Sequence, residues 1–219
     1  MSTDLACAYA RLLRAYGDVH TRVHVSECID TAVRALLACV VDANVRPPRT
    51  VVVRAPRAEP GHVEALPLAA AALLLALVRH RAAFDGIADI VVIMAGKRAV
   101  TRMLLSVRAW LATQDHHIAP PQRDTLRMLA ADGTGVVRLT ALPSGCAAAR
   151  LRSRVDGRLV LCDAYAASPD VMRALAGARV LLRDYATTVP LLLPPHRVLE
   201  NLDVDHEHRV CVQHIRVCE

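Results

Sequence analysis

The chain has 219 residues, enough for one large domain with a substantial core; 54% are hydrophobic but only 3% aromatic. Leucine, valine and alanine must therefore fill the core, which suits helices packed on a buried parallel sheet. The net charge of +6 favours polyanionic partners, although arginines scattered over solvated helix faces would give the same total.

The apolar pattern predicts helices alternating with short, buried strands through the middle of the chain. In chain order, helices are expected at residues 4–17 (ended by Gly17), 26–43, 63–81, 97–113, 126–130 and 168–175, and strands at residues 50–53, 87–94, 135–142, 158–162, 178–182 and 209–217. Residues 147–154 are expected to be irregular or helical, and a proline-rich segment around residues 190–195 leads to the last strand. This order predicts an α/β fold with a doubly wound, mostly parallel sheet.

Cysteine usage and the apolar runs exclude several classes of protein. The seven cysteines are odd in number, widely spread and without a CxxC pair, which indicates a reducing, intracellular location. The N-terminus lacks the pattern of a secretory signal. The longest apolar run, residues 65–78, is too short to span a bilayer and contains Pro67, so no membrane partner is expected.

The first strand–loop–helix unit occupies the place where P-loop proteins hold phosphates, but its side chains do not suit that task. A phosphate loop needs glycines that expose N–H groups, a lysine for the terminal phosphates and a Ser or Thr for magnesium. The sequence TVVVRAPRAEPGHVEALP supplies Gly61 but no lysine, Ser or Thr after it, and Pro60 has no N–H to donate. We expect no tightly held triphosphate there.

The strand at residues 158–162 runs into an aspartate, as a Walker B strand does. RLVLCD ends at Asp163, which could hold magnesium. A hydrolase usually adds a glutamate that orients the attacking water, but Ala164 and Tyr165 follow here. The catalytic acid is missing, so no catalytic residue is assigned.

These positions resemble the N-terminal ATPase domain of the herpesvirus terminase large subunit, whose Walker A reads V-P-R-R-H-G-K-T. Pro56 and Pro67 have the eleven-residue spacing of two prolines in that family. In an alignment without a gap, Pro60, Gly61 and His62 take the places of the family's glycine, lysine and threonine. The degenerate Walker A therefore comprises Pro56, Arg57, Pro60, Gly61 and His62. Asp156 and Asp163 keep the spacing of two Walker B aspartates, and residues 178–188 resemble the coupling strand that follows.

The resemblance covers roughly residues 50–215 and implies a P-loop NTPase-like three-layer sandwich at residues 50–219, preceded by a helical segment at residues 1–49. It implies an ASCE-type sheet with the Walker B-like strand beside the strand at residues 50–53. It further implies a catalytically inactive pseudo-ATPase without a cofactor, with a structural or assembly role in viral DNA packaging in the host nucleus. Other packaging or capsid proteins would be its partners, with DNA as a candidate. The sequence does not fix the oligomeric state.

Four arginines form the densest positive stretch and are candidates for contact with DNA or another polyanion: Arg150, Arg152, Arg154 and Arg158. Arginines two apart in an extended segment lie on one side and could follow phosphates, but a salt-bridged surface would use the same residues. Lys97, after Gly96 at the start of a predicted helix, suggests a weaker anion site, with a solvated helix start as the simpler interpretation.

Metal sites find little support in the sequence. A lone Asp163 could bind a metal, but an aspartate that ends a strand also serves as a helix cap or loop hydrogen bonder. Strand alternation would separate Cys211 from His214, which opposes zinc binding by the C-terminal cluster of His206, His208, Cys211, His214 and Cys218. No metal is therefore expected.

Two other functions are compatible with these residues. One is a basic α/β protein–protein interaction module without a packaging role. The other is an enzyme of another α/β class using Asp163 and a histidine, for which the sequence offers no coherent set of catalytic residues.

Overall fold

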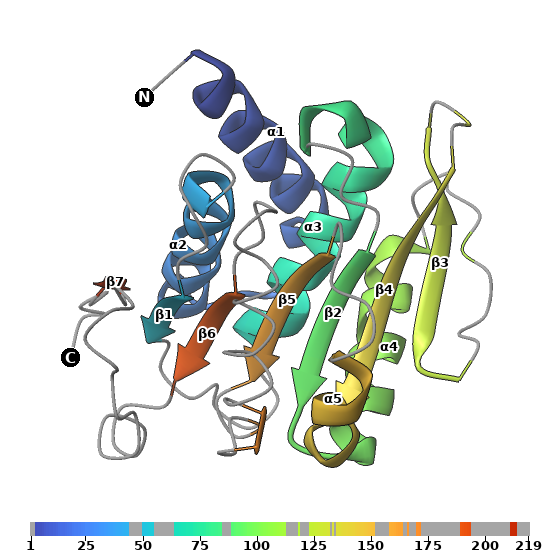
Figure 1. Ribbon diagram of the computed structural model, residues 1–219. Helices are drawn as coiled ribbons and strands as arrows, with labels where there is room; N and C mark the ends of the chain where they lie inside the picture. Colours follow the sequence, from blue (N-terminus) through green and yellow to red (C-terminus); the bar gives the residue numbers. More distant parts are fainter. Residues whose placement is uncertain are drawn as a thin grey trace.

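One mixed sheet organises the chain. The computed structural model describes residues 3–43, 50–54, 64–84, 89–112, 118, 123–131, 133, 135–151, 158–163, 166, 170–171, 189–193 and 211–213. Seven strands lie in the order β3-β4-β2-β5-β6-β1-β7 (Figure 1). Neighbours are parallel except β3 and β4, which are antiparallel. The strands are β1 (Thr50–Arg54), β2 (Asp89–Met94), β3 (Thr125–Leu129), β4 (Val136–Pro143), β5 (Arg158–Asp163), β6 (Val189–Leu193) and β7 (Cys211–Gln213).

Helices cover one face of this sheet. In Figure 1, α1 to α4 lie behind the strands, and α5 lies in front of them at the lower end of β4. The helices are α1 (Thr3–His20), α2 (Glu27–Ala43), α3 (Ala65–His80), the 3-10 turn η1 (Arg81–Phe84), α4 (Lys97–Leu111) and α5 (Ser144–Leu151). The predicted α/β class is confirmed.

The centre of the sheet is buried on both faces, as expected for parallel strands. In β2, Ile90, Val92 and Met94 join the core formed with the helices. Val91 and Ile93, which alternate with them, are also buried but lie outside that core cluster. This two-sided burial explains why β2 reads as one continuous apolar run.

Helix α3 is the centre of the helical layer. Every residue from Ala65 to Val78 is buried, because α1, α2 and α4 pack around it and its remaining side faces the sheet. A helix that is apolar all round requires such an environment. Pro67 lies in its first turn, where the missing N–H breaks no intrahelical hydrogen bond.

Two predictions about local structure are wrong. Residues 126–130 were expected to be helical, but Thr125–Leu129 form β3 because Leu126 and Met128 alternate with exposed Arg127 and Leu129 and pack against the core. Helix α1 does not stop at Gly17 but continues to His20, because the packing of buried Val19 outweighs the low helix propensity of glycine.

The position of β6 also differs from expectation. Its residues coincide with the proline-rich segment that was expected to be a connection. Pro190 lies opposite Val51 of β1, whereas pairing with β5 begins only at Leu191, so the proline precedes the part of β6 that is paired on both sides. Strand β6 lies between β1 and β5, so the expected direct adjacency of the Walker B-like strand and β1 is wrong.

Elsewhere the predicted elements are found within a few residues of their expected ends. Helix α5 begins at Ser144, earlier than the irregular or helical segment expected at residues 147–154. Asp170 and Val171, within the helix predicted at residues 168–175, are helical. The strand predicted at residues 178–182 lies outside the described residues. The last predicted strand, residues 209–217, contains the shorter β7.

Candidate functional site

The carboxyl ends of the parallel strands meet along one edge of the sheet. Strands β1, β2, β4, β5 and β6 end there at Arg54, Met94, Pro143, Asp163 and Leu193. In open α/β sheets ligands bind at this edge, where neighbouring strands send their connections to opposite faces. Strands β2 and β4 form such a pair, because α4 lies behind the sheet and α5 in front of it (Figure 1).

The degenerate Walker A residues come between β1 and α3 in the sequence. Strand β1 ends at Arg54 and α3 begins at Ala65, so the predicted strand before them and the predicted helix after them are confirmed. The loop residues themselves, Pro56, Arg57, Pro60, Gly61 and His62, lie outside the described residues.

Asp163 is the last residue of β5, as the Walker B comparison predicts. Its backbone lies opposite Leu192 of β6, and Cys162 lies opposite Leu191. The cysteine is fully buried, so the strand enters the edge from an apolar interior. The side chain of Asp163 lies outside the described part of the chain, and its binding of a metal stays a hypothesis.

The turns after β2 and β4 contact each other at the edge. The Ser144 Oγ, at the start of α5, donates a hydrogen bond of 3.4 Å to the Ala95 carbonyl oxygen after β2. Gly96 then caps α4 with an extended backbone and no side-chain hydrogen bond. The first turn of α4 contains Lys97 and Arg98 but no acid. Cations oppose the positive N-terminal end of a helix dipole, so this end favours an anion from outside the helix.

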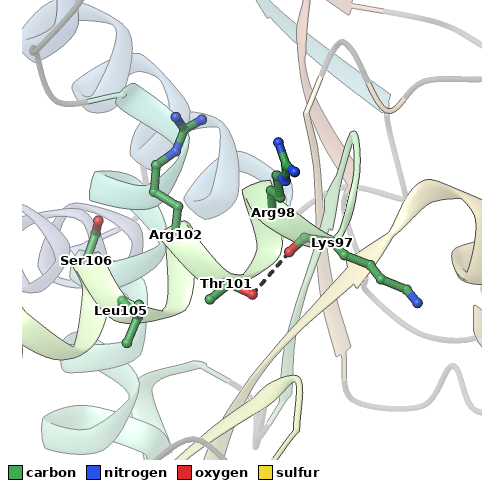
Figure 2. A pocket seen from close by; sticks show the side chains of 6 residues that line it. All are labelled: Lys97, Arg98, Thr101, Arg102, Leu105 and Ser106. Atoms are coloured by element: carbon green, nitrogen blue, oxygen red, sulfur yellow. Dashed lines mark hydrogen bonds between the residues drawn. The ribbon is translucent and has the colours of Figure 1, made fainter.

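The exposed side of α4 continues from that turn as a shallow groove that is widely open to solvent. In Figure 2, Arg98, Arg102 and Ser106 project to the same side of the helix, and Lys97 extends past its N-terminal end. The Arg102 guanidinium lies 3.1 Å from the Glu64 carboxylate, and both side chains are substantially exposed. The Thr101 hydroxyl donates to the Lys97 carbonyl oxygen at 3.2 Å. We call Lys97, Arg98, Thr101, Arg102, Leu105 and Ser106 the α4 groove.

The four arginines proposed for polyanion contact are described only in part. Arg150 lies in the last turn of α5 rather than in an extended segment, so the one-sided row expected from extended geometry is wrong for this residue. Its guanidinium lies 3.5 Å from the Asp124 carboxylate, which favours the salt-bridged alternative. Arg158 begins β5, but its side chain, like Arg152 and Arg154, lies outside the described residues.

A polar cluster between α1 and α2 was not anticipated from the sequence. The buried Tyr16 hydroxyl donates to Asp30 Oδ1 at 2.8 Å, and Arg34 Nε donates to Asp30 Oδ2 at 2.7 Å. The Arg34 guanidinium also lies 5.5 Å from the centre of the Tyr16 ring. The only sequence signal was the i, i+4 spacing of Asp30 and Arg34, because the partner from α1 depends on tertiary packing.

This cluster shifts the pKa values of its members. Burial raises the pKa of Tyr16, and its hydrogen bond to Asp30 raises that pKa further. Burial alone would raise the pKa of Asp30, but the hydrogen bonds from Arg34 and Tyr16 outweigh it, so the pKa lies below its usual value. The cluster is far from the strand ends in sequence and serves to join two helices.

Metal ligation finds no support where the structure can test it. Among the described residues no three His, Cys, Asp or Glu side chains are placed to share a metal ion. Cys211 begins β7, whereas His206, His208, His214 and Cys218 lie outside the described residues. The described helices include none long and apolar enough to cross a membrane. Comparison with protein-family models, curated proteins and solved structures finds no match.

Proposed function

We propose that the protein is a catalytically inactive, terminase ATPase-like subunit with a structural or assembly role in viral DNA packaging. The observation that carries this proposal is the chemistry of the loop between β1 and α3. The loop lies where a P-loop would lie, yet it has no lysine and no Ser or Thr after Gly61. Other packaging or capsid proteins in the host nucleus would be its partners.

The parallel strands and the place of Asp163 support a P-loop-like form of the fold. Strands β1 and β5 run in the same direction in one sheet, and Asp163 ends β5 at the edge where β1 also ends. Strand β6 lies between them, so the expected direct adjacency of the two strands is absent.

The substitutions in this framework argue against turnover. The P-loop lysine neutralises charge on the terminal phosphates, and the glutamate after Walker B orients the attacking water. The chain has Gly61 and Ala164 at these two positions. The missing N–H of Pro60 removes a further phosphate ligand. A fold that keeps its sheet and loses both groups suits a scaffold better than a motor.

An ATPase assay on the purified chain tests this proposal. We expect no magnesium-dependent ATP hydrolysis above a buffer blank and no rise in melting temperature with ATP and magnesium. Hydrolysis by the wild-type chain that disappears in Asp163→Ala would overturn the proposal. In virus-infected cells, deletion of the protein should leave capsids without DNA, whereas Asp163→Ala at normal expression should package normally.

A basic interaction module without a packaging role is the second candidate, and the net charge of +6 favours it, because acidic proteins are polyanions too. Duplex DNA in a gel-shift titration distinguishes the two candidates, because phosphate-driven binding weakens steeply with salt. The packaging proposal with DNA as a partner expects a salt-sensitive shift. A module for acidic proteins expects none at physiological salt.

A further inference from the structure

The outward face of α4 carries charge that the fold itself does not use. Its opposite face packs into the core through Val100, Met103, Leu104, Val107 and Leu111. The outward face exposes Lys97, Arg98, Thr101, Arg102 and Leu105. The helix is therefore amphipathic in the ordinary way, but the polar half has only one sign of charge.

Within the described part of the chain, Glu64 beside Arg102 is the one acid that pairs with a cation of this face. Lys97 and Arg98 lie in the first turn, where the helix dipole opposes positive charge. Neither has an ion-pair partner among the residues that the structure describes. Arg102 has Glu64, but an ion pair between such exposed side chains contributes little. Local electrostatics would thus be improved by an anionic partner.

The remaining groups of the α4 groove indicate the kind of anion. Thr101 and Ser106 add hydroxyl groups, which together with Arg and Lys are common ligands of phosphate oxygens. The groove contains no aromatic side chain, and Leu105 is its only large apolar residue. Protein interfaces usually depend on aromatic or apolar anchors, and single-stranded nucleic acids on stacking against aromatic rings. Both partners therefore fit this surface poorly.

We propose that the α4 groove binds the phosphate backbone of duplex DNA without reading base sequence. Arg98, Arg102 and Ser106 present a row of donors to one side of the helix (Figure 2). Lys97 extends beyond the N-terminal end of the helix. In this binding mode its ammonium group pairs with a separate phosphate. This inference goes beyond the proposed function, because it requires neither the P-loop relationship nor a role in packaging.

The salt dependence of binding gives the proposal a magnitude. Each phosphate neutralised on duplex DNA contributes about −0.9 to the slope of log K against log salt. Three cations in the α4 groove therefore contribute about −2.7. This share alone weakens binding roughly sixfold when salt rises from about 0.1 to about 0.2 M.

Fluorescence anisotropy of the full chain with a labelled duplex of random sequence tests the proposal. The test protein carries Lys97→Gln, Arg98→Gln and Arg102→Gln. The control carries Arg11→Gln, Arg14→Gln and Arg22→Gln, three exposed residues of α1 and the turn after it. Both variants lose the same net charge, and thermal melts verify that both stay folded.

We expect the α4 variant to lose affinity and about three units of salt slope, and the control to stay within about half a unit of the wild type. Equal losses in both variants would attribute binding to net charge and overturn the proposal. So would a wild-type preference for single-stranded DNA, or an α4 variant that binds the duplex as tightly as the wild type does. ATP hydrolysis, which would refute the pseudo-ATPase proposal, leaves this result unaffected.

Discussion

Replacing Tyr16 with phenylalanine tests how strongly the polar cluster joins α1 to α2. The change removes one hydroxyl that donates to the Asp30 carboxylate at 2.8 Å and leaves a ring of the same shape in a fully buried position. Hydrogen bonds to charged groups contribute about 1.5–3 kcal/mol. The Asp30 side chain is 24% exposed, so water can replace part of the lost interaction. We therefore expect a loss of about 1–2 kcal/mol in unfolding free energy.

Urea and thermal unfolding measure this loss of stability. For a chain of this size, a loss of about 1–2 kcal/mol lowers the melting temperature by roughly 2–8 °C. Tyr9→Phe is the matched control, because the hydroxyl of this partly buried tyrosine lies 3.5 Å from a neutral acceptor, the Arg34 carbonyl oxygen, instead of 2.8 Å from a carboxylate. That change should cost less than about 0.5 kcal/mol. Equal effects of the two substitutions would refute the reasoning.

The pH dependence supplies a second test of the cluster. The pKa of Asp30 is lower in the folded state than in the unfolded chain, so its contribution is complete above its ordinary pKa and is lost as pH falls through the lowered pKa. The difference between wild type and Tyr16→Phe should therefore be constant near neutral pH and shrink below about pH 4. A difference that grew with acidity would contradict the assigned charge state of Asp30.

Gly17 lies inside α1 with open space around its Cα, so Gly17→Ala should raise the unfolding free energy by about 0.5–1 kcal/mol. Gly133 has a φ of +69°, so Gly133→Ala should lower the unfolding free energy by about 1 kcal/mol. Chemical denaturation measures both changes, and changes of the same sign would contradict the backbone geometry. Burial and the cations Arg11, Arg79 and Arg14 lower the pKa of His80 in the folded state. The imidazole of His80 is therefore protonated more readily in the unfolded chain than in the folded one. Stability should fall as pH drops through about 6.5, and His80→Gln should flatten this part of the profile in a melting series. Leu75→Ala, at a fully buried position of α3, should lower the unfolding free energy in urea by about 2–5 kcal/mol. Leu105→Ala, on the exposed face of α4, is the control. An effect of Leu75→Ala no larger than that of the control would contradict the packing described for α3.

Much of the fold follows from periodicity in the sequence. The continuous apolar runs of β2 and α3 predict buried elements because no polar residue interrupts them. The segment at residues 125–129 was misread because Leu, Met and Arg favour helices locally, whereas pairing with β4 decides the outcome. The position of β6 between β1 and β5 depends on contacts between residues far apart in the chain, which no local pattern encodes.

The candidate site was predictable in part. The order of strand, loop and helix around residues 54–65 and the place of Asp163 at a strand end followed from the sequence. The α4 groove did not, although its signal was present as four cations without an acid in a helical segment. Only the structure separates the exposed side of α4, with Lys97, Arg98 and Arg102, from the buried one.

The insertion of β5 and β6 between β1 and β2 has a consequence for biosynthesis. A nascent chain that ends before Arg158 contains β1, β2 and all of α3, but the two strands that join the halves of the sheet have not yet been made. The facing edges of β1 and β2 then have no neighbouring strand, and the part of α3 that contacts β5 is uncovered, although β2 and β4 are already present. Because the sheet is completed late, through contacts between residues far apart in the sequence, folding is slow and apolar surface stays exposed while the chain is on the ribosome. Shortened chains ending near residue 155 should therefore aggregate, and efficient production should depend on chaperones that hold the first two-thirds of the chain.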